Sequence, residues 1–99
     1  MNLHTLDVSG NHSITDQGLK HLNLHTLKAS MEQCNITDDG IKHMDLHTLY
    51  ATENNKITDE GIKRMNLHTL DASYNHNITD RGIKVRCAAH FEVIKRFIF

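Results

Sequence analysis

The sequence lacks the bulky residues around which a small globular core usually forms. It has no tryptophan and no proline, and only two tyrosines and three phenylalanines among 99 residues. Leucine, isoleucine, valine and phenylalanine nevertheless number 25 together, which is more than the roughly 20% below which disorder is expected. The chain can therefore bury a core, and we expect that core to come from a repeated unit rather than from large aromatic anchors.

An excess of charge of one sign and long apolar runs are also missing. Eleven basic and 12 acidic residues give a formal net charge of −1, so no long-range field attracts nucleic acid or an anionic membrane. No apolar stretch is long enough to cross a bilayer, and no basic segment followed by an apolar one marks a secretory signal. We expect an intracellular, cytoplasmic protein that binds neither nucleic acid nor membrane.

Cysteine is scarce, and the two that are present are not spaced for pairing. Cys34 and Cys87 have no Cys-x-x-Cys spacing, and they lie more than two of the repeats described below apart. A disulfide requires Cα atoms within about 7 Å of each other. We therefore expect two free thiols.

A repeated block occupies most of the chain. Leu-His-Thr-Leu occurs four times, at steps of 21, 22 and 21 residues, beginning at Leu3, Leu24, Leu46 and Leu67. A second block, Ile-Thr-Asp-x-Gly-(Leu/Ile)-Lys, follows each copy and begins at Ile14, Ile36, Ile57 and Ile78. A fixed period of this length is typical of a solenoid, in which each unit buries its apolar face only against its neighbours.

Each part of the unit predicts a local structure. Leu6 and Val8 alternate with polar residues, which is the pattern of a short strand with one buried face. The threonine of the second block is a predicted helix N-cap, and the aspartate after it is favourable at the positive end of the helix dipole. Between them, in three of the four copies, stands an asparagine whose amide can satisfy the backbone of a tight turn: Asn11, Asn54 and Asn75.

The second copy has one extra residue in this turn. Counting from the strand puts Glu32 in the asparagine position, and counting back from Ile36 puts Gln33 there. Cys34 lies one position further on. The spacing predicts a bulge but leaves the occupant of the position open.

The signature Leu3-x-x-Leu6-x-Val8-x-x-Asn11 resembles the leucine-rich repeat, in which Leu-x-x-Leu-x-Leu-x-x-Asn/Cys marks a strand and its turn. The second half of the unit is similar to the cysteine-containing, F-box-associated (RNI-like) repeat subclass. The resemblance implies an α/β leucine-rich-repeat solenoid of four right-handed rungs, each with a short parallel strand and a short helix. We place the rungs at residues 2–22, 23–44, 45–65 and 66–84, within one domain of residues 1–84.

Residues 85–99 break the repeat. Cys87, Phe91, Ile94 and Ile98 recur at helical spacing, which predicts a helical C-terminal cap over the last rung. No comparable cap precedes Leu3. The chain therefore resembles a fragment of a longer repeat protein, and we expect the bare N-terminal edge to favour self-association.

One column of the repeat consists of histidines. Parallel strands stack about 4.8 Å apart, so equivalent side chains form a row at that spacing. A straight row offers a metal at most two ligands at once, whereas a structural zinc site needs a tetrahedral shell. We expect surface histidines with no metal and no other cofactor, and keep a metal-responsive or pH-responsive ladder as the alternative. The row comprises His4, His25, His47 and His68.

The sequence does not indicate an enzyme. An active site needs unlike groups at one place, whereas the polar residues here recur in every rung. A triad could be drawn from His4, Asp7 and Ser9, but the fourth copy repeats the same trio and no oxyanion donors are implied. The sequence has no phosphate loop, zinc-protease motif or nucleophile elbow.

Columns that vary while the frame stays fixed are candidates for specificity. They lie on the strand face, which is concave in curved repeat proteins and accepts extended partners. We therefore predict a protein–protein interaction module. The alternatives are a substrate-recognition fragment of an F-box-type ubiquitin ligase and a structural remnant of a truncated repeat protein. The predicted contact residues are Asp7, Lys28, Tyr50 and Asp71, flanked by Ser9, Ser30, Thr52 and Ser73, and then by Met31, Glu53 and Tyr74.

Overall fold

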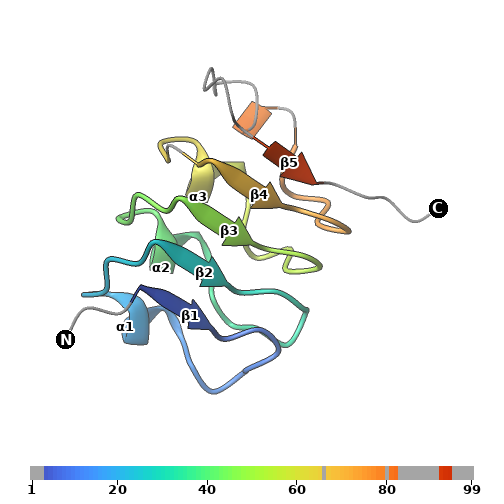
Figure 1. Ribbon diagram of the computed structural model, residues 1–99. Helices are drawn as coiled ribbons and strands as arrows, with labels where there is room; N and C mark the ends of the chain where they lie inside the picture. The colour runs from blue at the N-terminus through green and yellow to red at the C-terminus, as the bar shows by residue number, and fades with distance from the viewer. Residues whose placement is uncertain (1–3, 66, 80, 83–91, 95–99) are drawn as a thin grey trace.

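The computed structural model describes residues 4–65, 67–79, 81–82 and 92–94, which form a stack of parallel rungs (Figure 1). Neighbouring strands pair in parallel and in sequence order, and the short helices lie behind the sheet on the return path of each rung. The predicted alternation of parallel strands and short helices is confirmed. The strands are β1 (Thr5–Asp7), β2 (Thr26–Lys28), β3 (Thr48–Tyr50) and β4 (Thr69–Asp71), and the helices are α1 (Asp16–Leu19), α2 (Asp38–Ile41) and α3 (Asp59–Ile62).

The fourth rung has the start of its own helical turn at residues 81 and 82. All three named helices are four residues long. None of the helices in the described part of the chain has the length and apolar character needed to span a bilayer.

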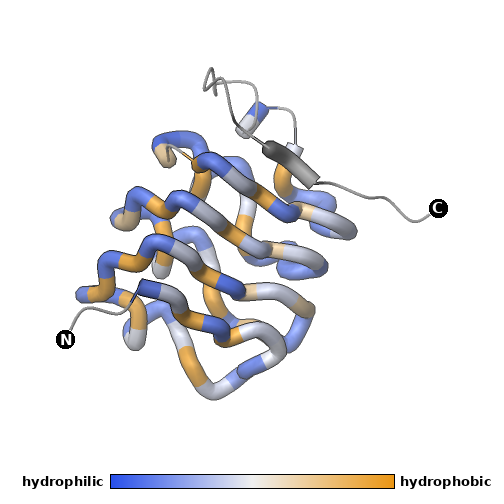
Figure 2. The backbone as a smooth tube through the Cα atoms, in the orientation of Figure 1, coloured by the Kyte–Doolittle hydropathy of each residue, from blue (hydrophilic) through white to orange (hydrophobic). Residues whose placement is uncertain are grey.

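Equivalent leucines of successive rungs pair in register, so one apolar spine runs through the stack. Leu27, Leu49 and Leu70 are fully buried, as the alternating pattern predicted. Figure 2 shows apolar positions recurring at the same place in successive rungs. Leu6 is only partly buried, because β1 is the first strand of the sheet and is covered from one side. Burial of each rung therefore depends on its neighbours.

The turn asparagines of the third and fourth rungs are buried and bind backbone. Asn75 donates through Nδ2 to three carbonyls of the preceding rung, at 2.7 to 3.2 Å. Its Oδ1 accepts from two backbone N–H groups of its own turn. Asn54 donates in the same way to the carbonyls of Ala29 and Ile36. Buried amides that are satisfied in this way hold the turn of one rung against the next.

The structure shows which residue takes the asparagine position in the longer second turn. Cys34 is fully buried there, whereas Glu32 and Gln33 are exposed. Burial raises the pKa of the Cys34 thiol, which keeps it protonated and unreactive. Lys56 closes this turn by donating to the carbonyls of Glu32 and Cys34 at 2.9 and 3.0 Å. Cys87, the other predicted free thiol, lies outside the described residues.

The aspartate of the second block ties each rung to the next. Asp38 accepts hydrogen bonds from the backbone N–H of Thr58 at 2.7 Å and from its hydroxyl at 2.5 Å. Asp16 and Asp59 accept the same pair of bonds from Thr37 and Thr79. The sequence predicted a role for these carboxylates only at their own helix ends. The structure adds a bond across every rung interface, which we call the Asp–Thr clamp.

The threonine caps are confirmed in three rungs and wrong in the first. The hydroxyls of Thr37, Thr58 and Thr79 each accept from a backbone N–H two residues later, at 3.2 Å. Thr15 makes no such bond. In the three later rungs the clamp orients the hydroxyl, because its proton points to the aspartate and a lone pair is left for the helix. Thr15 lies in the first rung and has no clamp partner among the described residues.

The helix predicted for the C-terminal segment is not what residues 92–94 form. Glu92–Ile94 is a fifth strand, β5, which pairs in parallel with β4 and continues its register (Figure 1). The edge of β4 presents unpaired backbone N–H and carbonyl groups, and a short segment with two β-branched residues satisfies them best as a strand. The rest of the segment, with Cys87, Phe91 and Ile98, lies outside the described residues.

Candidate interaction face

The outward side chains of the first four strands form one column across the sheet. In the strand register, Asp7 pairs with Lys28, Lys28 with Tyr50, and Tyr50 with Asp71. Asp7 and Lys28 are exposed, and the other two are half-buried. The structure thus brings these predicted contact residues together. We call the surface formed by these four side chains and the turn residues Met31, Glu53 and Tyr74 the strand face.

Charged groups in this column interact with one another. The Nζ atom of Lys28 lies 5.6 Å from the centroid of the Tyr50 ring, within the range of a cation–π contact. Asp7 accepts from the backbone N–H of Ser9 at 3.0 Å. That bond lowers the pKa of Asp7, and the Ser9 hydroxyl and the charge of Lys28 lower it further. Lys28 therefore lies between an anion and an aromatic ring.

The serine and threonine column offers a partner little surface. Ser73 is only 5% exposed, and Ser9, Ser30 and Thr52 are half-buried. The Ser9 hydroxyl accepts from the backbone N–H of Ser30 at 3.0 Å and so links two rungs. These predicted contact residues help to hold the frame, and the accessible part of the strand face lies to either side of them.

The turn residues of the strand face have an unusual backbone conformation. Met31, Glu53 and Tyr74 have φ angles of 81°, 63° and 57°, and Gly10 fills the same position in the first rung with φ 71°. L-residues enter this left-handed region at a cost of about 1–2 kcal/mol, whereas glycine enters it freely. Met31 is also 50% exposed, the largest apolar exposure among the described residues. Sequence reasoning missed this constraint, although Gly10 was a visible signal of it.

A hollow of about 260 Å³ opens beside these turns. Glu53 and Tyr74 line it from successive rungs, together with Glu32 of the second rung. Asn55 and His76 complete the wall, and the Asn55 side-chain oxygen accepts from the backbone N–H of His76 at 2.7 Å. Two carboxylates and a phenol ring thus surround one small space. The sequence did not single out Glu32, because the length of its turn hid its position.

The histidine column is a stack of parallel rings. Ring centroids of successive histidines lie 4.3 to 4.6 Å apart, with interplanar angles of 11° to 17°. Each Nδ1 shares a hydrogen bond with the hydroxyl of the next residue, a threonine, at 2.8 to 3.2 Å. Loss of hydration within the stack lowers the pKa of His25, and the neighbouring His4 and His47 lower it further. Within the described ranges, no three His, Cys, Asp or Glu side chains are grouped to hold a metal ion.

Comparison with known families agrees with this geometry. A family model described as "Leucine Rich repeat" matches residues 1–22 and 63–85, which cover the first rung and the fourth. The intervening rungs each have a strand and a short helix, and their strands pair in register with those of the first and fourth rungs. The fold is that of a leucine-rich-repeat solenoid. No curated protein and no solved structure was found to match the chain.

Leucine-rich repeats are typically non-enzymatic modules that mediate protein–protein interaction.

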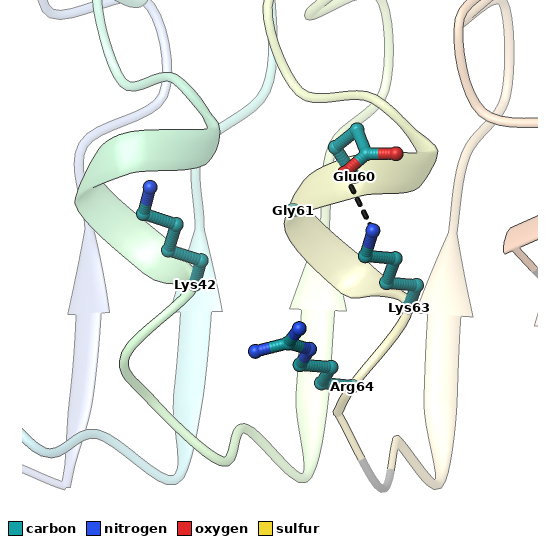
Figure 3. Close-up of a pocket in the computed structure, with 5 residues that line it drawn as sticks. All are labelled: Lys42, Glu60, Gly61, Lys63 and Arg64. Atoms are coloured by element: carbon teal, nitrogen blue, oxygen red, sulfur yellow. Dashed lines mark hydrogen bonds and ion pairs between the residues drawn. The ribbon is translucent and has the colours of Figure 1, made fainter.

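On this leucine-rich-repeat solenoid the helix side carries a second hollow, of about 350 Å³, between α2 and α3 (Figure 3). Lys42, Lys63 and Arg64 line it with Glu60 and Gly61. Lys63 pairs with Glu60 at 2.7 Å, and Lys42 pairs with Asp39 at 3.1 Å. Exposed pairs of this kind contribute little energy.

Proposed function

We propose that this protein is an interaction module that binds a protein partner on its strand face. The observation that carries the proposal is the contrast between a fixed frame and a variable outward surface. The spine leucines and Asp–Thr clamps recur from rung to rung and the turn asparagine recurs in three rungs of four, whereas the outward strand position changes from aspartate to lysine to tyrosine. Positions without a structural role are free to carry specificity.

The strained turn supports the same surface. Three of the four rungs keep a large side chain at a position where glycine would relieve strain. Backbone strain of this kind concentrates at functional sites. Retention of Met31, Glu53 and Tyr74 is therefore consistent with a use for their side chains outside the fold.

Affinity capture with matched variants tests this function. Tyr50→Ser/Tyr74→Ser alters the strand face, and Gln17→Ala/Lys20→Ala alters the exposed helix side as a control. We expect quantitative mass spectrometry to show partners that are retained by the wild type and the control but lost from the strand-face variant. An equal loss from both variants, or from neither, would contradict the proposal.

A finer form of this proposal is substrate recognition for an F-box-type ubiquitin ligase. The buried Cys34 favours it, because the resembling repeat subclass carries cysteine at the turn where other repeats carry asparagine. Ubiquitin-ligase subunits among the partners that depend on the strand face would support this form. Partners without any ligase subunit would leave the general interaction function and remove the ligase assignment.

The stacked histidines support a second candidate function, a response to protons. Four imidazole rings at 4.3 to 4.6 Å spacing cannot all take up a proton without placing like charges side by side. Protonation of His25 therefore opposes the stacked arrangement. The pH dependence of stability, described in the Discussion, tests this candidate separately from partner binding.

A further inference from the structure

We propose that the partner of the strand face is an extended basic segment, and that one of its arginine or lysine side chains enters the hollow beside Tyr74. This inference rests on the proposed interaction function and adds the chemistry of the partner. It is carried by the charge of the surface and by the kinds of group that line the hollow.

The strand face is acidic although the chain as a whole is nearly neutral. Its carboxylates belong to Asp7, Glu53 and Asp71, and Glu32 adds another in the adjoining hollow. Lys28 is the one cation of the strand face, and it already lies over the Tyr50 ring and beside Asp7. A basic segment complements this surface, whereas an acidic segment or a nucleic acid meets like charge.

The hollow contains the groups that recognise a cationic side chain. Glu32 and Glu53 provide carboxylates, and Tyr74 provides an aromatic ring. A guanidinium or ammonium group gains charge-assisted hydrogen bonds from the first kind of group and a cation–π contact from the second. Lys56 is a cation that contacts the same turn, and its ammonium is bound to the carbonyls of Glu32 and Cys34. It is not part of the lining of the hollow.

The spacing of the rungs favours an extended partner. Neighbouring strands lie about 4.8 Å apart, so the column from Lys28 to Asp71 spans about 10 Å. An extended chain advances about 3.3 Å per residue and crosses this column with about three residues. Its alternate side chains then face the strand face.

Tyrosine fluorescence tests this proposal directly. The chain has no tryptophan, and its two tyrosines both lie on the strand face. The probe is a short blocked peptide that alternates arginine and threonine, and the comparison peptides replace arginine with glutamine or with glutamate. We expect saturable quenching by the arginine peptide alone, and a higher half-saturation concentration at high salt.

Matched variants assign the effect to the hollow. Glu32→Gln/Glu53→Gln is expected to weaken binding of the arginine peptide by about threefold, the scale of two exposed ionic contacts. Asp39→Asn/Glu60→Gln removes the same charge from the helix side and is expected to leave binding unchanged. Thermal melting of both variants establishes that each is folded.

The outcomes separate this inference from the function on which it rests. Equal binding of the arginine and glutamine peptides, equal loss in both variants, or no binding of the arginine peptide would overturn the basic partner. If the Tyr50→Ser/Tyr74→Ser variant still loses its captured partners in any of those cases, the interaction function stands with a partner of other chemistry. If the Tyr50→Ser/Tyr74→Ser variant keeps all of its captured partners, the interaction function is contradicted, and the basic partner is contradicted with it.

Discussion

The glycine of the second block is set by the carboxylate of the preceding rung. A Cβ atom added at Gly61 would lie 2.2 Å from Asp38 Oδ1, and Gly40 and Gly82 are restricted in the same way. Gly18 has no such neighbour, since its nearest contact is an Ile14 methyl group at 3.5 Å. The glycine is thus required in three rungs, whereas the first rung has room for a side chain at this position.

This difference predicts opposite effects for the same substitution. Gly61→Ala is expected to lower the free energy of unfolding by ~2 kcal/mol, because it overpacks the clamp. Gly18→Ala is expected to raise it by about 0.5–1 kcal/mol, because alanine is the better helix former. Urea denaturation of both proteins measures the two values. Equal effects would mean that the Asp–Thr clamp does not restrict the glycine.

The left-handed turn gives a second prediction for single residues. Glu53→Gly is expected to raise the free energy of unfolding by about 0.5–1 kcal/mol, because relief of strain exceeds the added entropy of the unfolded chain. Glu53→Ala removes the same carboxylate but keeps the strain, so it serves as the control and should leave stability nearly unchanged. Denaturation midpoints compare the three proteins. A stabilised alanine variant would show that charge rather than backbone strain is the cause.

At the scale of the structural element, each rung interface depends on one carboxylate that binds two donors. Asp38→Ala leaves the half-buried N–H and hydroxyl of Thr58 without their acceptor. We expect a loss of about 2 kcal/mol in the free energy of unfolding, the usual cost of an unsatisfied polar group. Asp39→Ala changes the adjacent exposed carboxylate, which only pairs with Lys42 at the surface. The expected cost of Asp39→Ala is below about 1 kcal/mol. Similar losses for Asp38→Ala and Asp39→Ala in chemical denaturation would contradict a role for the clamp.

The strands, their register and most helix caps could be predicted because each depends on residues close in the sequence. Leu6 and its equivalents repeat with a regular period, and parallel stacking of identical units then allows only one register. The Asp–Thr clamp was not predicted, because its partners are 20 or 21 residues apart and meet only after stacking. The fate of Glu92–Ile94 was decided by the open edge of β4, which local spacing does not reveal.

The candidate surface was also predictable where it depends on residues close in the sequence. The column from Asp7 to Asp71 follows from strand alternation and was placed correctly in space. The position of Glu53 and Tyr74 was found, but their backbone conformation was not, and the one signal of it was Gly10 at the equivalent position of the first rung. The hollow was missed because one of its walls, Glu32, lies in the turn with the extra residue.

At the scale of the whole molecule, the histidine stack predicts a loss of stability in mild acid. The pKa of His25 is lowered from 6.5, so the unfolded chain takes up this proton before the folded one does. Stability is therefore fully present above pH 6.5 and declines as the pH falls from there through the lower folded pKa. We expect the melting temperature to decrease as the pH falls from about 6.5 to about 5.

Variants of the stack distinguish this effect from general acid sensitivity. His25→Gln/His47→Gln should flatten the pH dependence of the melting temperature, whereas His12→Gln/His21→Gln, two exposed histidines outside the stack, should not. The pKa of Asp7 is lowered from 3.8, so its contribution is lost only at more acidic pH. The two ranges are therefore separable in one titration. A wild-type melting temperature that stays constant down to pH 5 would exclude the histidine effect.

The Asp–Thr clamp also bears on how such a chain can lengthen. Every rung from the first to the third offers an acceptor to the next, and every rung from the second to the fourth offers the matching donors. A tandem copy of residues 45–65 inserted after residue 65 would therefore meet compatible surfaces above and below without any further substitution. We therefore expect one such duplication to add a rung to the stack, and the outward residues of the new copy are then free to diverge.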